Sequence, residues 1–281
     1  MKDHHTYPLL FLLLFASCDF QPAIEQTSYL ARPHFKIVTE NATYLYDMMG
    51  GGFSSIKDKE GIEWVGFKTS EDKFPAGAAT CFRGLPNMVY QGEDGGTGHP
   101  GFEQCITKVT SKNQIQTESK SGKWKWKWTF TDNGAYLNIL ETDTTRQYWF
   151  LYEGTPGGKF DPKNQYWGNN IDGLKTDTPY LQDSIANGRW DWAYFGHNEI
   201  NRSLVVAQLT SDTLVDNFSY LGNTSKGINA EDGMVVFGFG RTGARQLLKG
   251  NNRFFIGFSE CDPANQTCFD QWLKRIRKDT F

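Results

Sequence analysis

The chain has 281 residues and a formal net charge of −3 at pH 7, with aromatic residues making up 15% of it. Because no basic run of five or more residues occurs, nothing in the charge pattern indicates a nucleic-acid partner. Long amphipathic helical windows are absent from the sequence, while Trp, Tyr, Phe, Thr and Val come in short runs, so the composition predicts an all-β protein.

Residues 1–17 have the pattern of a secretion signal. Lys2 provides a small positive region, and the apolar run Leu9–Ala16 is too short for a permanent transmembrane helix. The segment Phe15–Cys18 resembles the lipobox of bacterial lipoproteins, which implies a lipid on Cys18 and anchoring in the cell envelope, on the outer membrane. An ordinary secretory peptide is the alternative. Residues 18–33 lack a clear period and are predicted to form a tether.

Alternation of apolar and polar residues begins after the predicted tether. Phe35–Thr39 and Ala42–Tyr46 are predicted to be half-buried strands. The turn signal Asp58–Gly61 follows, and it predicts a hairpin whose second strand is Ile62–Phe67.

The segment Cys81–Cys105 is the strongest candidate for a functional site. Its six glycines and two prolines predict a shaped loop rather than a strand of the core. The polar side chains in it are of the kinds that bind sugar hydroxyls and carboxylates or transfer protons. These residues are Arg83, Tyr90, Glu93, Asp94 and His99. The alternative is a disulfide-tied surface loop whose glycines only serve its turns.

Four cysteines remain after Cys18, an even number in an oxidising compartment. Three pairings can be drawn, and local pairing is expected, with Cys81 bonded to Cys105 and Cys261 bonded to Cys268. A zinc site is not predicted, because no CxxC motif occurs and the histidines are few and scattered.

A strict two-residue period follows in Lys123–Trp128, which places three indoles on one face of a strand and three lysines on the other. We expect the indoles to lie in the core and the lysines in water. A sugar-stacking platform is the alternative. Tyr136–Leu140 is predicted to pair with this strand across the turn Asp132–Gly134.

Residues 146–197 carry aromatic and polar side chains with little regular period. Such a long segment is predicted to be either a saccharide cleft or an irregular subdomain packed by its own tryptophans, and the two remain equal alternatives. The candidate binding residues in it are Tyr166, Trp167, Arg189, Trp190, Asp191, Tyr194 and His197.

The C-terminal part is predicted to be scaffold. Leu204–Leu209, Met234–Gly240 and Arg253–Phe258 are apolar runs typical of buried strands, and Phe269–Arg277 has the apolar spacing of a short amphipathic helix. No internal repeat or boundary is found, so residues 34–281 are predicted to form a single domain.

Several segments resemble the galactose-mutarotase-like, or aldose epimerase, superfamily. They are Phe53–Trp64, Gly84–Pro86 and Gly98–Phe102. The resemblance implies an antiparallel β-supersandwich in which His99 takes part in sugar binding and proton transfer and Arg83 binds hydroxyls. Pro100 interrupts the family's motif, its second catalytic histidine has no counterpart, and its late catalytic glutamate is present only if Glu260 serves.

Together these patterns predict a carbohydrate-active lipoprotein outside the cytoplasm, using acid/base chemistry on a polysaccharide or oligosaccharide. A lyase is the first interpretation, in which an arginine neutralises a uronate carboxylate while histidine and tyrosine transfer protons. The predicted catalytic residues are Arg83, His99, Tyr194 and His197, and the predicted substrate-binding residues are Tyr90, Glu93, Tyr166, Trp167, Arg189, Trp190 and Asp191.

Other classes stay open at this point. A hydrolase would use a pair of carboxylates, an epimerase-like enzyme would act on a sugar ring, and a non-catalytic surface lipoprotein would bind glycans for uptake. No cofactor motif is found, and a Ca²⁺ site in the acidic loop stays an alternative. The chain is expected to be a monomer.

Overall fold

The computed structural model describes residues 22–66, 104–148, 150–181, 183–222, 227–230, 233–240 and 248–278. These residues form three antiparallel sheets and one α-helix, which confirms the predicted all-β fold with a short C-terminal helix. No helix in these ranges is long and apolar enough to cross a membrane.

The N-terminal sheet has four strands in sequence order. They are β1 (Ala23–Tyr29), β2 (Arg32–Val38), β3 (Ala42–Asp47) and β4 (Gly52–Asp58). The segment expected to be a tether therefore contains β1 and the start of β2, and Ile24 of β1 packs against the core. The two strands are joined by Leu30 and Ala31, which both have the positive φ that a two-residue hairpin turn requires.

The large sheet has nine strands. In spatial order they are β11 (Gly173–Lys175), β10 (Gln165–Asn169), β13 (Trp192–His197), β14 (Ser203–Gln208), β17 (Arg253–Ser259), β8 (Gly134–Glu141), β7 (Lys125–Thr131), β6 (Gln114–Ser119) and β5 (Cys105–Ser111). The third sheet contains β12 (Ala186–Gly188), β15 (Asp216–Leu221), β16 (Met234–Phe239) and β9 (Phe150–Gly154). Two short 3-10 turns, Pro156–Gly158 and Gly227–Asn229, complete the described elements together with α1 (Gln266–Ile276).

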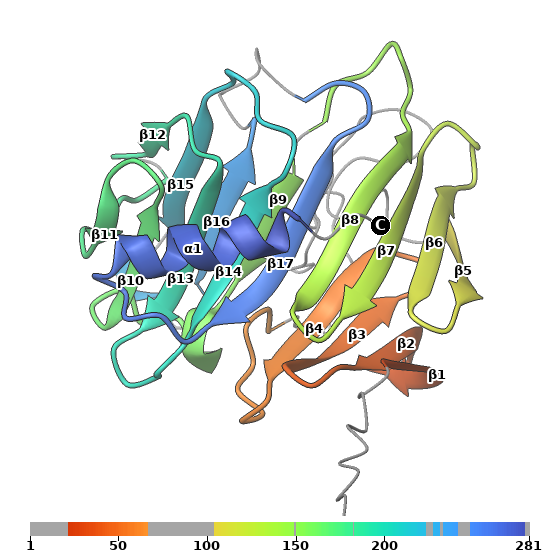
Figure 1. The fold of residues 1–281 in the computed structure, drawn as a ribbon, viewed down its shortest axis with the longest axis horizontal. Coiled ribbons are helices and arrows are strands. Elements are labelled where there is room, and N and C mark those ends of the chain that lie inside the picture. Colours follow the sequence, from red (N-terminus) through yellow and green to blue (C-terminus); the bar gives the residue numbers. More distant parts are fainter. Residues whose placement is uncertain are drawn as a thin grey trace, which may run out of the picture.

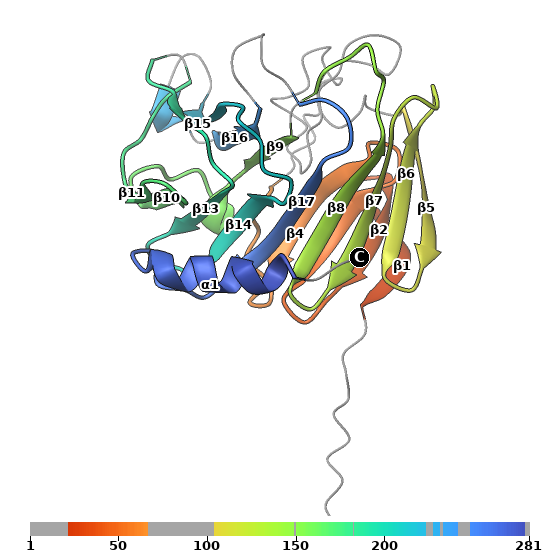
Figure 2. The ribbon, with the colours of Figure 1, turned by 45° about the horizontal axis from the view of Figure 1, so that its top comes forward.

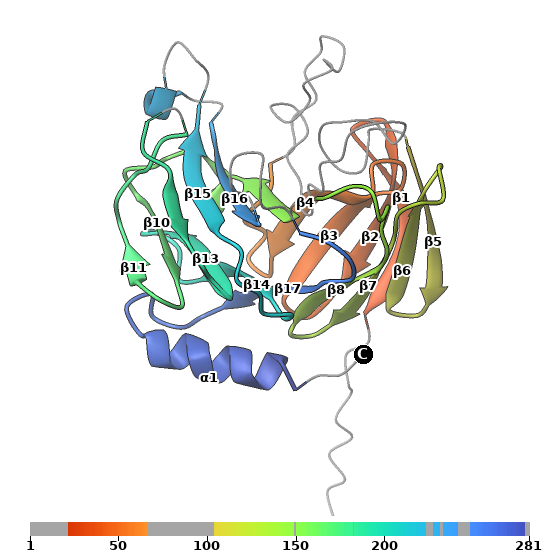
Figure 3. The same cartoon turned by 90° about the horizontal axis from the view of Figure 1, so that it is seen from above.

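The N-terminal sheet and the third sheet lie side by side against one face of the large sheet (Figure 3). One apolar core joins all three sheets. Trp124, Trp126 and Trp128 lie in this core with at most 1% of their surface exposed, which confirms the burial expected for the three indoles. They are therefore not a sugar-stacking platform.

On the other face of the large sheet, α1 lies across β10, β13, β14 and β17 (Figures 1 and 2). Phe269, Leu273 and Ile276 of α1 are buried there against tyrosines and aliphatic residues of the sheet. The helix begins after Asn265, whose side chain accepts a hydrogen bond from the Cys268 N–H. Since both faces of β10 and β13 are covered, every residue of these strands is buried, and they show no alternation of apolar and polar side chains with a two-residue period.

The disulfide between Cys261 and Cys268 is present, as predicted. It connects the segment after β17 to the first turn of α1. Cys105 is buried at the start of β5, while its predicted partner Cys81 lies outside the described residues.

Replacing both Cys261 and Cys268 with serine is expected to lower the free energy of unfolding by about 2 kcal/mol, because the cross-link restricts the unfolded chain. Urea unfolding of the variant and of the oxidised protein measures this difference. Equal midpoints would show that the cross-link adds nothing to stability.

Candidate functional site

The predicted loop site cannot be placed in this structure. Arg83, Tyr90, Glu93, Asp94 and His99 all lie outside the described residues. Their roles in the binding and conversion of a sugar therefore stay predictions.

Tyr166 and Tyr194 lie beneath α1. The Tyr194 ring stacks on Phe269 with centroids 4.3 Å apart, and its hydroxyl donates to the Pro263 carbonyl at 2.7 Å. The Tyr166 hydroxyl lies 3.0 Å from the Ser203 hydroxyl. Burial raises the pKa of both phenols, and only 1% of Tyr194 is exposed. The position of Tyr194 is thus that of a packing residue between helix and sheet.

Trp167 and Trp190 lie between the large sheet and the third sheet. Their rings pack edge to face with centroids 5.7 Å apart, and Trp167 also packs on Phe218. With 2% and 4% of their surface exposed, neither indole offers a face to a sugar, which corrects the predicted binding role. Of their neighbours, Arg189 is exposed, and the Asp191 carboxylate forms an ion pair with Arg277 at 3.3 Å.

His197 lies at the end of β13 and lines a cavity of about 360 Å³ together with Tyr166. Its Nδ1 accepts the Glu199 N–H at 3.2 Å, so the neutral ring carries its proton on Nε2. That nitrogen lies 3.5 Å from Asp161 Oδ2. Of the residues predicted to form the site, Tyr166 and His197 are brought together at one cavity.

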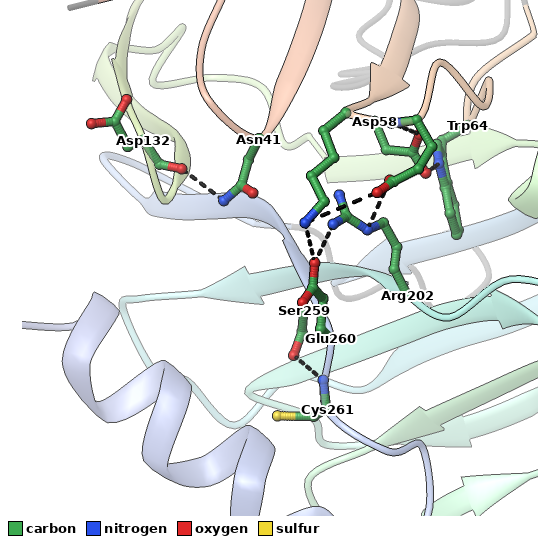
Figure 4. A network of polar contacts seen from close by, with 10 residues as sticks. Asn41, Asp58, Trp64, Asp132, Arg202, Ser259, Glu260 and Cys261 are labelled. Carbon is green, nitrogen blue, oxygen red and sulfur yellow. Dashed lines mark hydrogen bonds and ion pairs between the residues drawn. The ribbon is translucent and has the colours of Figure 1, made fainter. Parts of the chain in front are cut away.

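Glu260 was the one candidate for the late catalytic glutamate. Its carboxylate forms ion pairs with Lys59 at 2.5 Å and with Arg202 (Figure 4). These two cations hold the pKa of Glu260 below its usual range. A carboxylate held in this way is a weak base, so the structure does not favour Glu260 as the group that removes a proton.

A polar cluster that the sequence did not reveal lies on the N-terminal sheet, and we call it the N-terminal cluster. Its members are Tyr29, Arg32, His34, Asp47, Ser54 and Glu63. Phe35, Ile37, Tyr44 and Tyr46 of β2 and β3 point into the core. Because side chains alternate along a strand, His34 and Asp47, which are paired across the two strands, lie on the opposite face.

Arg32 and Asp47 form the buried ion pair of the cluster. Arg32 Nε donates to Asp47 Oδ2 at 2.6 Å, and Asp47 Oδ1 accepts the N–H groups of Met49 and Gly50. Burial alone would raise the pKa of Asp47, but the hydrogen bond and positive charge of Arg32 outweigh it and lower that pKa. The carboxylate is therefore ionised and fixes the turn after β3.

His34 has its two ring nitrogens fixed by different partners. Nδ1 lies 3.0 Å from the Arg32 carbonyl oxygen, which can only accept, so Nδ1 carries a proton. Burial lowers the pKa of His34 and keeps the ring neutral at pH 7. Nε2 is then an acceptor for the Ser54 hydroxyl, 2.8 Å away. The arrangement is a neutral imidazole with a basic nitrogen directed at a hydroxyl group.

Tyr29 and Glu63 are the partly exposed members of the cluster. The Tyr29 ring packs edge to face on His34, with centroids 5.5 Å apart. Burial and the negative charge of Glu63 raise the pKa of Tyr29, so its phenol stays protonated and can donate. The Glu63 carboxylate in turn accepts the Ser55 hydroxyl at 2.5 Å and four backbone N–H groups at 2.9–3.1 Å. The predicted hairpin is therefore present only in part: Glu63 forms one antiparallel bridge with Lys57 of β4, and residues 64–66 bend around the Glu63 carboxylate instead of continuing as a strand.

The sequence held one signal for this cluster. Arg32, His34 and Lys36 alternate with apolar residues, and such a row of polar side chains would have marked the face of β2 that points away from the core. The prediction of a tether up to residue 33 hid the first of them. No group of three or more His, Cys, Asp or Glu residues within the described ranges could hold a metal ion.

The stability of the protein is expected to fall as the pH is lowered below about 6.5. Since folding lowers the pKa of His34, the unfolded chain binds a proton there that the folded chain does not. Urea unfolding at several pH values should show a smaller loss for His34→Gln than for the parent protein. Parallel pH profiles would mean that His34 is not the titrating group.

The chain matches no protein-family model and no curated protein. Its fold is similar to that of solved structures. The protein HI1317 is 11% identical with a TM-score of 0.56, covering 85% of this chain and 96% of the other. YeaD from Salmonella typhimurium, described as a candidate mutarotase, is 10% identical with a TM-score of 0.55, covering 84% and 94%. The chain thus has the galactose-mutarotase-like fold, as its sequence segments implied.

Proposed function

We propose that the protein binds a carbohydrate, and that the N-terminal cluster forms part of the binding surface. The fold similarity to a candidate mutarotase over 84% of the chain supports the substrate class. The protein is proposed to lie outside the cytoplasm, attached to a membrane by a lipid on Cys18. A glycan-binding surface lipoprotein is accordingly the first candidate.

The observation that carries the proposal is the position of Tyr29. Its half-buried ring offers an apolar face, and its protonated hydroxyl can donate to a sugar oxygen. The ring is held against His34, which is itself fixed by Ser54 and the Arg32 carbonyl. A rigid aromatic side chain supported by satisfied polar groups binds a ligand with little loss of entropy.

A second candidate is an aldose-epimerase-like enzyme, and the His34–Ser54 pair favours it. Opening a sugar ring requires a base for the anomeric hydroxyl proton and an acid for the ring oxygen. The basic Nε2 of His34, acting through Ser54, would take up the first proton, and the Tyr29 phenol would supply the second. The resemblance of the sequence to aldose epimerases implies that His99 and Arg83 would take part in the same reaction.

Both candidates are tested on the purified protein with a panel of free aldoses and of neutral and acidic polysaccharides. Retardation in an affinity gel detects binding, and polarimetry detects mutarotation. Ultraviolet absorbance of an unsaturated product would indicate the lyase, and new reducing ends without it would indicate a hydrolase. We expect retardation by a saccharide, weakened at least about tenfold in Tyr29→Ala, a loss of ~1.4 kcal/mol.

Leu30→Ala is the matched control, because Leu30 is exposed in the adjoining turn. Mutarotation that is lost in His99→Ala and in His34→Gln would establish the enzyme. Silence of every readout, or binding that Tyr29→Ala leaves intact, would remove the proposed site.

A further inference from the structure

Two neighbouring cavities lie at the turn between β13 and β14, and we call them together the rim groove. The first, of about 360 Å³, contains Tyr166 and His197, and the second, of about 300 Å³, contains Glu60, Arg202 and Glu260. Both are lined by Glu199, Ile200 and Asn201. Their volumes are at the lower end of the range of ~300–1,000 Å³ found for small-molecule sites. None of the lining residues belongs to the N-terminal cluster.

Arg202 carries an unsatisfied donor at this groove. Only 4% of its side chain is exposed, its Nε lies 3.3 Å from Glu60 Oε2, and its Nη2 contacts Glu260 (Figure 4). Within the described part of the chain, the buried Nη1 has no hydrogen-bond partner. Leaving a buried donor without an acceptor costs free energy. An oxygen atom of a ligand would relieve this cost.

His197 carries a second donor of this kind in the first cavity. Its side chain is 1% exposed and its Nε2 makes no hydrogen bond to any described residue, with the Asp161 carboxylate 3.5 Å away. The Nε2 proton, fixed by the bond from Glu199 to Nδ1, has only the distant Asp161 carboxylate as its acceptor, and a ligand oxygen at a shorter distance would be a better one. Each cavity thus holds one buried donor that lacks a close acceptor among the described residues.

The charges around Arg202 identify the ligand chemistry. Lys59 and Arg202 balance the carboxylates of Glu60 and Glu260, and Lys159 lies 3.8 Å from the third carboxylate of the lining, that of Glu199. The second cavity therefore does not attract a strongly charged ligand. Carboxylates and the exposed Asn201 amide bind hydroxyl groups, while Ile62 and Ile200 provide apolar contact. A neutral saccharide has both hydroxyl groups and apolar C–H faces.

We infer that the rim groove is a second saccharide-binding site, which takes two neighbouring units of a neutral oligosaccharide. The substrate class rests on the proposed function, whereas the site itself rests on Arg202 and His197. The β13–β14 turn lies between the two units and contacts both.

The test is isothermal titration with neutral oligosaccharides of glucose, galactose and mannose, and with an oligogalacturonate for comparison. Asn201→Trp introduces a bulky indole at a residue that lines both cavities and leaves Arg202 and His197 unsubstituted, and Asn251→Trp is the control at another exposed asparagine. We expect a neutral oligosaccharide to bind at two sites, of which Asn201→Trp removes one and Tyr29→Ala the other. Asn251→Trp should keep both.

The outcomes separate the two proposals. A single site that Tyr29→Ala removes and Asn201→Trp leaves intact would overturn the rim groove and keep the proposed function. A single site that Asn201→Trp removes and Tyr29→Ala leaves intact would support the rim groove and show that the N-terminal cluster is not a binding surface. If the rim groove binds only the oligogalacturonate, the inference that its ligand is neutral is wrong. If no saccharide binds at all, both proposals are wrong.

Discussion

Replacing Asp47 with alanine is expected to lower the free energy of unfolding by about 3–5 kcal/mol, as is typical when one member of a buried ion pair is removed. The substitution takes away the carboxylate that Arg32 contacts at 2.6 Å, in a place where Asp47 is fully buried. It also leaves the Met49 and Gly50 N–H groups without their acceptor. Urea unfolding followed by tryptophan fluorescence measures the loss.

Glu25→Ala is the matched control for Asp47→Ala. It removes the carboxylate of an ion pair with Lys36 on the same sheet, but both side chains there are exposed. Such surface pairs contribute about 0–1 kcal/mol, so the control should unfold close to the parent protein. Similar losses in the two variants would show that the buried pair has no special part in stability. In that case the N-terminal cluster would lack the rigid base on which the proposed binding surface depends.

The first hairpin of the N-terminal sheet was not predicted, because its turn lacks the usual turn residues. Hairpins of this kind are recognised by Asn-Gly or Asp-Gly, since those residues adopt positive φ easily. Here Leu30 and Ala31 adopt it instead, held by the seven residue pairs between β1 and β2. The strands after residue 34 were predictable, because one of their faces packs on the core and the other carries polar groups.

The aromatic residues of β10 and β13 show why site residues were harder to predict than strands. Composition alone cannot distinguish an indole that stacks on a sugar from one that packs in a core. Trp167 and Trp190 are buried because the third sheet covers them, and Tyr194 because α1 does. Which surface is covered depends on the packing of distant segments, and a local pattern does not contain that information.

The burial of the indoles in Lys123–Trp128 could be predicted from the sequence, because strict alternation shows which side chains share a face. Substitution of Trp126 tests this prediction. Trp126→Ala is expected to cost about 3–5 kcal/mol, the usual range for deleting a fully buried aromatic side chain. The indole N–H donates to the Tyr46 hydroxyl at 2.9 Å, and that hydroxyl lies 2.8 Å from Thr117 Oγ1. The substitution therefore breaks a hydrogen-bonded link between the N-terminal sheet and the large sheet.

Thermal and urea unfolding of Trp126→Ala should be compared with Lys127→Ala, the next residue, which points to the opposite face. Lys127 is partly exposed, so its truncation should change stability by no more than about 0.5 kcal/mol. If the indoles bound sugar instead, Trp126→Ala would keep its stability and lose retention on the saccharide gel. A large loss of stability in Trp126→Ala alone would show that this indole belongs to the core of the large sheet and not to a binding surface.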